Sequence, residues 1–200
     1  WWFFERNGVS SVFIPFLGDI AIGWAIVPLF AFAVVATGNA VNISDGLDGL
    51  AGGLLSLSYS TFGVIALMQG QVFLAGFCFT VVGALLSYVW FNIYPARFFM
   101  GDVGSFSLGA ALGVVAMLTN TFFLLPVIGA LFVAEAGSSA LQILSKKIFK
   151  RKIFLSAPVH HHLEAIGWPE TKVTMRFWVI GAVAAFIGVL LALAGGNISS

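Results

Sequence analysis

The chain is built from long apolar runs that charged side chains scarcely interrupt. Between Gly49 and Ala96 there is no Asp, Glu, Lys or Arg. Hydrophobic residues make up 60% of the chain and charged residues only 8%, whereas soluble domains carry about 25% charged residues. So few charges cannot cover a globular surface in water. We therefore expect an integral membrane protein, and a net charge of +1 gives no reason to expect a nucleic-acid partner.

Several of the apolar runs are long enough to cross a membrane, since a spanning helix needs about 20 mostly apolar residues. Six such runs lie at residues 20–38, 49–68, 72–92, 104–119, 122–145 and 175–194. They are continuously apolar, whereas the strands of a membrane β-barrel alternate in polarity. The predicted fold class is an all-α polytopic helical bundle with about six transmembrane helices, forming one membrane-embedded domain over residues 1–200.

The basic residues gather on one side of this arrangement. Of the nine Lys and Arg residues, only Arg6 falls outside the segments 39–48, 92–103 and 146–174 and the start of the last helix. Cytoplasmic loops carry the excess of Lys and Arg in membrane proteins. These segments are therefore expected to face the cytoplasm together.

Polar residues recur every three positions where the first run ends. In "NAVNISDGLDGL" they are Asn39, Asn42, Asp45 and Asp48. On a helix such positions are neighbours, each turned by about 60° from the last, so they form a slanting stripe. A single acid here would be read as a helix cap. Two acids and two amides at a membrane boundary favour a functional stripe instead, because polar groups are costly there and usually functional.

A second polar motif, "FNIYPARFFMGDVGSFSLG", spans residues 91–109. Asp102 stands just ahead of an expected helix, beside Gly101 and Gly104, where it could simply cap that helix. The functional alternative is a Mg²⁺ ligand, with the glycines admitting a phosphate to the helix N-terminus. Phe98 and Phe99 are either interfacial anchors or a stacking surface for a planar base, and the residues alone favour the anchors.

The third segment, 146–174, contains a basic run and all three histidines of the chain. The basic run is typical of an amphipathic helix end on anionic lipid. His160, His161 and His162 lack the further ligands or the HExxH spacing that a zinc site needs. Histidines among Lys and Arg better fit diphosphate binding or proton shuttling.

Two polar residues fall inside or near the expected span 122–145. Glu135 either forms a hydrogen bond between helices on a small-residue packing face or has a functional role, and the sequence does not decide between these. Gln142 lies nearer the cytoplasmic end and is the better candidate to touch a ligand.

Taken together, these segments resemble the polyprenyl-phosphate N-acetylhexosamine-1-phosphate transferases. The resemblance rests on "NAVNISDGLDGLAGG", "FNIYPARFFMGDVGSFSLG" and "APVHHHLEAIGWPETKVTMRFW", which follow in the family's order from residue 39 to residue 178. The histidine segment with its "GWPE" extension points to the family's peptidoglycan branch. That resemblance implies transfer of phospho-MurNAc-pentapeptide from UDP-MurNAc-pentapeptide to undecaprenyl phosphate, giving lipid I and UMP. It also implies a Mg²⁺ cofactor and a multi-pass place in the bacterial inner membrane, where the reaction serves cell-wall synthesis, cell shape and division.

The resemblance also assigns roles to single residues. Asp102 becomes the Mg²⁺ ligand and, with Asp45 and His160, a catalytic residue. Phe99 becomes the stacking partner of uracil, which reverses the anchor reading. The substrate-binding set is Asn39, Asn42, Asp45, Asp48, Phe99, Gln142, His160, His161 and His162.

One departure from the family pattern concerns the start of the chain. The family carries an Asp-Asp pair on an earlier cytoplasmic loop, and this sequence contains no adjacent Asp pair. The aromatic "WWFFERNG" at residues 1–8 is also typical of an interfacial belt at a helix end. We therefore expect the C-terminal portion of a ten-helix protein, about ten spans being the family pattern, and no activity from this portion alone.

Rival interpretations remain open. A related enzyme would transfer GlcNAc-1-phosphate to a polyprenyl phosphate, although the histidine segment argues against it. A transporter would place ionisable residues near the membrane midplane, where only Glu135 is expected. An inactive membrane fragment with a scaffold role is the third alternative. The sequence does not determine the oligomeric state, and a homodimer is one candidate. The other expected partners are the two substrates and the lipid bilayer.

Overall fold

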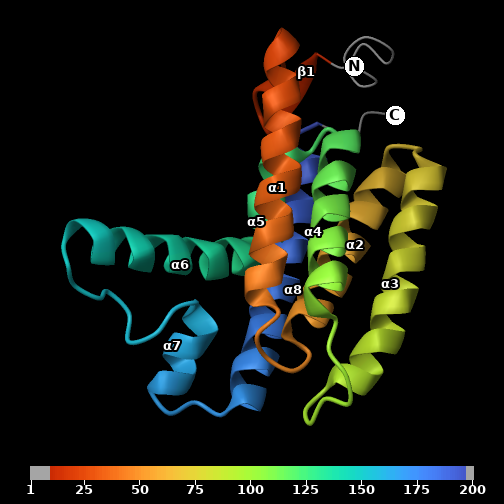
Figure 1. Cartoon of the computed structure of the whole chain (residues 1–200). Coiled ribbons are helices and arrows are strands. Elements are labelled where there is room, and N and C mark those ends of the chain that lie inside the picture. The colour runs from red at the N-terminus through yellow and green to blue at the C-terminus, as the bar shows by residue number, and fades with distance from the viewer. Residues whose placement is uncertain (1–9, 197–200) are drawn as a thin grey trace.

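The computed structural model describes residues 10–196, in which long helices stand side by side (Figure 1). The helices long and apolar enough to cross a membrane are α1 (Ile26–Ser44, extended by a 3-10 turn from Gly23), α2 (Leu50–Met68), α3 (Val72–Asn92), α4 (Gly101–Leu118) and α8 (Glu170–Ala194). A long run without charges has no other stable form in lipid, because a helix satisfies its own backbone hydrogen bonds. The predicted class, an all-α polytopic membrane protein, is confirmed.

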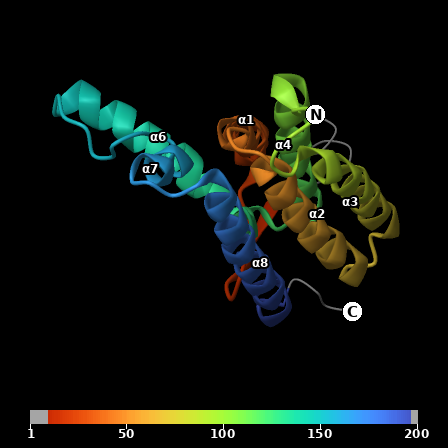
Figure 2. The ribbon, with the colours of Figure 1, turned by 90° about the horizontal axis from the view of Figure 1, so that it is seen from below.

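Helix α2 forms the centre of the bundle. Of its most apolar stretch, 78% is buried inside the bundle, whereas the corresponding share is at most 39% for the other spans of the described chain. Leu55, Tyr59 and Phe62 are fully buried, and the helix packs most extensively against α3 and then against α8. Figure 2, seen from below, shows α2 between these two helices. Because α2 is fixed by its neighbours, the turn that precedes it is also held firmly in place.

Helices α1 and α4 pack at very close range. A Cβ atom added to Gly109 would lie 2.8 Å from the carbonyl oxygen of Thr37, and one added to Gly113 would lie 2.9 Å from that of Ala33. Small residues four positions apart permit such approach between membrane helices. The close contact carries the end of α1 up to the start of α4.

The fifth expected span, residues 122–145, is not a straight helix. After a 3-10 turn at Phe122–Leu124, the chain forms α5 (Leu125–Ile128) and then bends by 83° into α6 (Ala130–Ile148). Figure 1 shows α6 crossing the direction of the other helices and projecting from the bundle. The predicted run of spanning length is present as the bent pair α5 and α6, but the bend was not predicted, because hydropathy registers length and apolar character and not direction.

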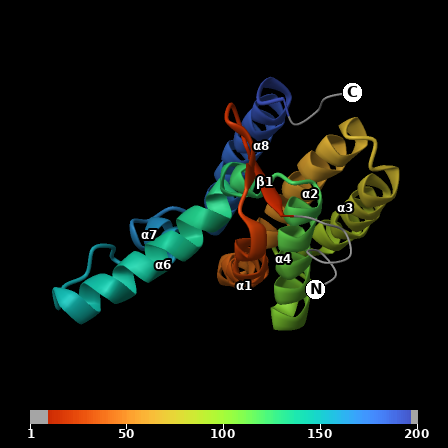
Figure 3. The ribbon, with the colours of Figure 1, turned by 90° about the horizontal axis from the view of Figure 1, so that it is seen from above.

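The end of the bundle that holds the N-terminal region carries a small hairpin. Strands β1 (Ser11–Ile14) and β2 (Gly18–Ala21) pair antiparallel, and Figure 3 shows β1 from above across the helix ends. The amide of Asn120 donates to Asp19 Oδ1 at 2.9 Å and so ties the hairpin to the bundle. The hairpin was not predicted from the sequence, and the interfacial belt predicted at residues 1–8 lies outside the described residues.

The opposite end brings together the segments that carry the motifs. The turn 45–49 between α1 and α2, the loop 93–100 between α3 and α4, and α7 (Val159–Ala165) with the start of α8 all lie there (Figures 1 and 2). The spans alternate in direction, and therefore every second connection reaches this end. The sequence prediction that these segments share one side is confirmed for the two loops and for α7 with the start of α8, whereas the basic run 146–152 lies at the far end of the projecting helix α6 (Figure 1).

Candidate functional site

The end of α1 and the start of α4 bring an amide against a carboxylate. Asn42 Nδ2 donates to Asp102 Oδ1 at 2.9 Å and to Ser105 Oγ at 3.0 Å. Helix α4 begins at Gly101, earlier than expected, so Asp102 lies in its first turn; Met100 is the N-cap, and it forms no side-chain cap. The carboxylate of Asp102 is therefore left for contacts outside its own helix.

Asp45 lies in the turn after α1 and shares this site. Helix α1 ends at Ser44, so the predicted stripe is helical only through Asn42, and both aspartates that follow lie in the turn. Burial raises the pKa of Asp45, repulsion by Asp102 raises it further, and a hydrogen bond from the Gly101 backbone opposes the rise. Two carboxylates close enough to repel each other favour a cation between them.

The donor set fits Mg²⁺ that a substrate helps to hold. Mg²⁺ is usually bound by one or two carboxylates together with substrate phosphates, and Asp45 and Asp102 supply that number. Within residues 10–196 no group of three or more His, Cys, Asp or Glu side chains could hold a metal. The arrangement suits an ion shared with phosphate oxygens and not a closed protein cage.

Asp48 connects the turn to two other segments. Its backbone N–H donates to Glu170 Oε1 at 2.6 Å, and its Oδ2 accepts from the backbone N–H of Ala96 at 2.9 Å. The hydroxyl of Thr174 donates to the Asp48 carbonyl at 3.2 Å. One residue thereby joins the α1–α2 turn, the α3–α4 loop and the start of α8.

Asn92, at the end of α3, bonds to the same α1–α2 turn and α3–α4 loop. Its Oδ1 accepts from the backbone N–H of Gly49 at 3.0 Å, and its Nδ2 donates to the carbonyl of Phe98 at 2.9 Å. Trp178 Nε1 donates to the Gly49 carbonyl at 3.1 Å. The sequence prediction missed Asn92, although a lone amide at the end of an apolar run was the available signal.

The two phenylalanines of the α3–α4 loop have different surroundings. Phe98 packs edge-on against Tyr88, with ring centroids 5.5 Å apart. Phe99 is 67% exposed and lines a mostly apolar pocket of about 370 Å³ between α3 and α4. Phe98 lines the same pocket and is 48% exposed, so both rings are partly accessible, and Phe99 is the more accessible of the two.

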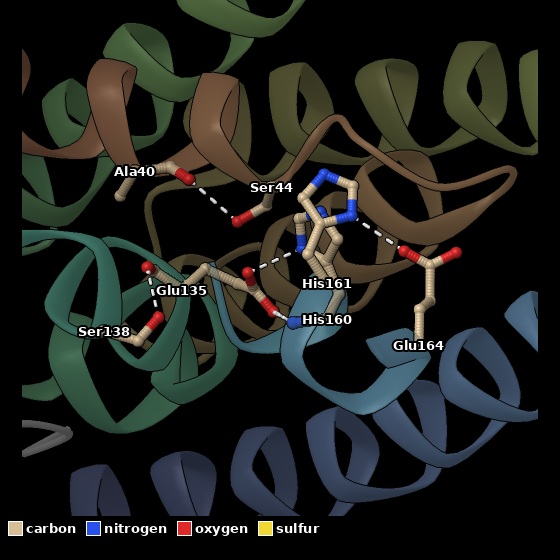
Figure 4. Close-up of polar contacts among 7 residues, drawn as sticks. All are labelled: Ala40, Ser44, Glu135, Ser138, His160, His161 and Glu164. Atoms are coloured by element: carbon tan, nitrogen blue, oxygen red, sulfur yellow. Dashed lines mark hydrogen bonds and ion pairs between the residues drawn. The ribbon is translucent and has the colours of Figure 1, made fainter. Parts of the chain in front are cut away.

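The three histidines of α7 divide into a buried ring and two outer ones. His160 is 1% exposed, and its Nδ1 lies 2.7 Å from Oε2 of the fully buried Glu135 on α6 (Figure 4). His161 pairs with Glu164 at the same distance, but at the surface. His162 Nδ1 accepts from the backbone N–H of Leu155 at 3.3 Å.

His160 lies directly against the α1–α2 turn. A Cβ atom added to Gly46 would stand 2.5 Å from His160 Nε2. That nitrogen is buried and has no hydrogen-bond partner within residues 10–196. The structure therefore places the buried histidine beside the turn that carries Asp45 and Asp48.

Two residues of the predicted binding set make local bonds. Gln142 Oε1 accepts from the backbone N–H groups of Ile153 and Phe154 at 3.0 and 3.1 Å, and its Nε2 donates to the Phe154 carbonyl at 2.8 Å. Asn39 Nδ2 donates to the Val35 carbonyl of its own helix at 2.8 Å. Gln142 thereby closes the loop after α6, and the side chain of Asn39 is bonded to its own helix.

A basic cluster flanks the junction at the start of α8. The Lys172 Nζ and Arg176 Cζ atoms lie 4.5 and 4.4 Å from the ring centroid of Trp168. Cations at this distance are attracted to the electron-rich face of an indole. The cluster adds positive charge to the end of the bundle that carries the carboxylates.

An apolar groove of about 400 Å³ runs between α1, α5 and α6. Phe32, Ala36 and Ala40 line it from α1, and Phe132 and Ala136 line it from α6. It exists because α6 turns away from the bundle at Gly129 and leaves the side of α1 uncovered. Ala40 stands one turn before Ser44, so the groove leads along α1 toward the polar site.

Fold and site together define a polytopic membrane protein with paired carboxylates and a buried histidine at one end and an apolar groove along α1. Residues 1–120 match the model of glycosyl transferase family 4. The chain belongs to this family, and the resemblance found in its sequence is confirmed at that level.

Curated relatives extend the match over nearly the whole chain. The phospho-N-acetylmuramoyl-pentapeptide-transferase of Chloroflexus aggregans is 47% identical over 201 residues, covering 96% of this chain and 54% of the relative. The enzyme of the same name from Rubrobacter xylanophilus is 42% identical, and the match covers 92% of this chain and 56% of the relative. That of Geobacillus kaustophilus is 41% identical, and the match covers 94% of this chain and 59% of the relative. The chain spans about half the length of these relatives.

Proposed function

We propose that the chain is part of a Mg²⁺-dependent phosphoglycosyl transferase of peptidoglycan synthesis. It would transfer phospho-MurNAc-pentapeptide from UDP-MurNAc-pentapeptide to undecaprenyl phosphate, releasing UMP and forming lipid I. The observation that carries the proposal is the meeting of Asp45 and Asp102, with Asn42, at one end of a membrane bundle. The identity to named transferases supports the choice of substrates.

The chemistry requires charge neutralisation more than covalent catalysis. An oxygen of the lipid phosphate forms a bond to the β-phosphorus of the UDP-sugar, the bond to the UMP oxygen breaks, and UMP leaves with the electron pair. Mg²⁺ bound at Asp45 and Asp102 would supply positive charge to the diphosphate. Asn42 holds the Asp102 carboxylate in place through its 2.9 Å hydrogen bond. Lys172 and Arg176 add further positive charge nearby.

The groove beside α1 supports a polyprenyl acceptor. Its lining is almost wholly apolar, and small residues such as Ala36, Ala40 and Gly137 leave room for a methyl-branched chain. The 83° bend before α6 opens the groove sideways, so a lipid could enter from the bilayer while its phosphate reaches the polar site. The distribution of Lys and Arg supports a cytoplasmic position for that site in the bacterial inner membrane.

The accessible aromatic ring supports a nucleotide donor. Phe99 presents an uncovered ring at the edge of the site, where uracil could stack. His161 is also exposed next to the buried His160, with ring centroids 4.2 Å apart. We place the diphosphate at the turn 45–49, beside α7, and the uridine toward Phe99.

Asp102→Asn in the full-length gene product carrying these residues tests the proposal. Mg²⁺-dependent UMP release from UDP-MurNAc-pentapeptide and undecaprenyl phosphate should be lost, because one ligand of the ion is neutralised. The thermal midpoint should remain near that of the wild type. Asp19→Asn is the matched control, since Asp19 lies in the hairpin at the opposite end of the bundle, and turnover should be unchanged.

The outcomes separate the metal assignment from the substrate assignment. Full turnover by Asp102→Asn would refute Asp102 as the Mg²⁺ ligand. Turnover of UDP-GlcNAc in place of UDP-MurNAc-pentapeptide would refute the proposed donor while retaining the reaction class.

A further inference from the structure

Glu135 is a buried carboxylate that directs both of its oxygens to one residue. Oε2 lies 2.7 Å from His160 Nδ1, and Oε1 accepts from the His160 backbone N–H at 3.2 Å (Figure 4). Both side chains are essentially unexposed, at 0% and 1%. A buried carboxylate is costly unless it is well bonded. Here the compensating bonds all fix the position of a single imidazole.

These contacts determine which nitrogen of His160 carries a proton. A carboxylate only accepts hydrogen bonds, so at 2.7 Å from it Nδ1 must carry the hydrogen in both the neutral and the charged imidazole. Nε2 is then the nitrogen that can exchange a proton or bind a ligand. In catalytic triads a carboxylate fixes the histidine tautomer in the same way.

Nε2 points at the turn that carries the candidate metal ligands. It is buried, it has no partner within residues 10–196, and it lies where a side chain at Gly46 would have to go. Buried nitrogens of this kind normally have a hydrogen-bond partner. A ligand arriving at the turn 45–49 would supply the missing partner.

We propose that Glu135 is a positioning residue, which holds His160 as the Nδ1–H form with Nε2 directed at the α1–α2 turn to meet a phosphate oxygen of the substrate. The identity of that phosphate as the nucleotide-sugar diphosphate rests on the proposed function. Glu135 itself reaches the reaction only through His160.

The neighbouring His161–Glu164 pair provides a built-in comparison. Its Nδ1 to Oε2 distance is also 2.7 Å, but the two residues are three apart on one helix, and their side chains are 46% and 34% exposed. Exposed pairs of this kind contribute little, because water and salt screen them. Glu164→Gln is therefore a matched control for Glu135→Gln.

The first experiment reads the histidine rings directly and needs no activity. The chain contains three histidines, so ¹⁵N-histidine labelling of the protein in lipid nanodiscs reports three imidazoles, and His160→Asn identifies the buried one. We expect Nδ1–H at this ring in the wild type. In Glu135→Gln the side-chain oxygen of the glutamine still accepts from the His160 backbone N–H, so the glutamine NH₂ group must face Nδ1. Because that NH₂ group donates, Nδ1 must accept, and the proton of the neutral imidazole should move from Nδ1 to Nε2.

Two results of this experiment would overturn the proposal. One is a buried ring whose tautomer is the same in Glu135→Gln as in the wild type. The other is a tautomer change at the buried ring in Glu164→Gln that equals the change in Glu135→Gln. Glu135→Gln preserves side-chain volume, and Glu135→Asp, which keeps the charge and should keep Nδ1–H, gives a second variant if the first is too unstable to measure.

The second experiment uses turnover in the full-length protein. Glu135→Gln should lower kcat about 10–100-fold, the range typical when the outer partner of a metal-bound histidine is removed, because the orienting contact is of the same kind. KM for the UDP-linked substrate should change little, and Glu135→Asp should restore part of the rate. In a His160→Asn background, Glu135→Gln should cause no further loss, because the two residues act as one unit.

The outcomes separate this inference from the proposed function. Independent, additive losses in the double variant, or an effect confined to KM, would overturn the positioning role. Absence of transferase activity in the wild-type protein would refute the proposed function, whereas the tautomer measurement would still decide the role of Glu135.

Discussion

Replacement of Gly109 by alanine should force α1 and α4 apart. The added Cβ would lie 2.8 Å from the Thr37 carbonyl oxygen and 2.9 Å from Gly38 Cα, whereas ordinary contacts lie at 3.4–4 Å. These atoms belong to the backbone of a packed helix and cannot rotate away. The helices must therefore separate locally by about 0.6 Å, which a close-packed interior does not absorb freely.

The expected free-energy change is a difference between two opposing effects. Overpacking of this kind costs about 1–3 kcal/mol, while alanine is about 1 kcal/mol better than glycine inside a helix. Gly76 on α3 provides the matched control, since nothing among the described residues lies within 4 Å of a Cβ placed there. Gly76→Ala should show only the helix gain, so the two variants should differ by about 1–3 kcal/mol.

Stability and activity can both be measured for this pair. In unfolding measurements in detergent or nanodiscs, Gly76→Ala should be more stable than the wild type, and Gly109→Ala should be less stable than Gly76→Ala. Because α1 carries Asn42 and α4 carries Asp102, separation of the helices should also lengthen their 2.9 Å hydrogen bond and reduce Mg²⁺-dependent turnover. Equal stability of the two variants would refute the close backbone contact as the basis of this packing.

Two further predictions concern the polar junction. Asn92→Ala should destabilise the protein by about 1–3 kcal/mol, because it leaves the buried Gly49 N–H unpaired, and the loss of the bond to the partly buried Phe98 carbonyl should add less. An unchanged denaturation midpoint would contradict this. The raised pKa of Asp45 means that its ionised form weakens the folded state, so without Mg²⁺ stability should rise as the pH falls through that raised value toward the ordinary 3.8. Asp45→Asn should remove this rise, increase stability at neutral pH and reduce the stabilisation by added Mg²⁺. The measurement is the pH profile of the thermal midpoint with and without Mg²⁺. Profiles of the variant that match those of the wild type would count against Asp45 as a group that binds the ion.

Much of the fold could be predicted because lipid leaves few alternatives to a chain segment. The runs at 49–68 and 72–92 match α2 and α3 to within one residue at each end, since an uncharged apolar run in a bilayer satisfies its backbone hydrogen bonds as a helix. The hydropathy pattern does not predict the direction in which a helix runs. Pro126 and Gly129 mark a weak point in the fifth run, but the local pattern does not contain the long-range contacts of α5 with α8 and of α6 with α1 that accompany the 83° turn.

The candidate site shows the same division between local pattern and long-range contact. Shared sidedness was enough to place Asp45 and Asp102 at one end of the bundle. The pairing of Glu135 with His160 depends on how the chain returns from the tip of α6, across 25 positions of sequence. No periodicity encodes that return, so the role of Glu135 could only be left open at the sequence level.

The bonds of Asp48 affect how loss-of-function mutations here should be interpreted. A mutational scan scored by turnover would rank Asp48 beside Asp102, since either substitution should abolish activity. Yet removal of the Asp48 carboxylate releases the loop that carries Phe99, through the lost bond to Ala96. A loss of turnover at Asp48 is therefore evidence for a displaced loop, whereas a loss at Asp102 is evidence for the proposed metal site, and the two cannot be ranked on one functional scale.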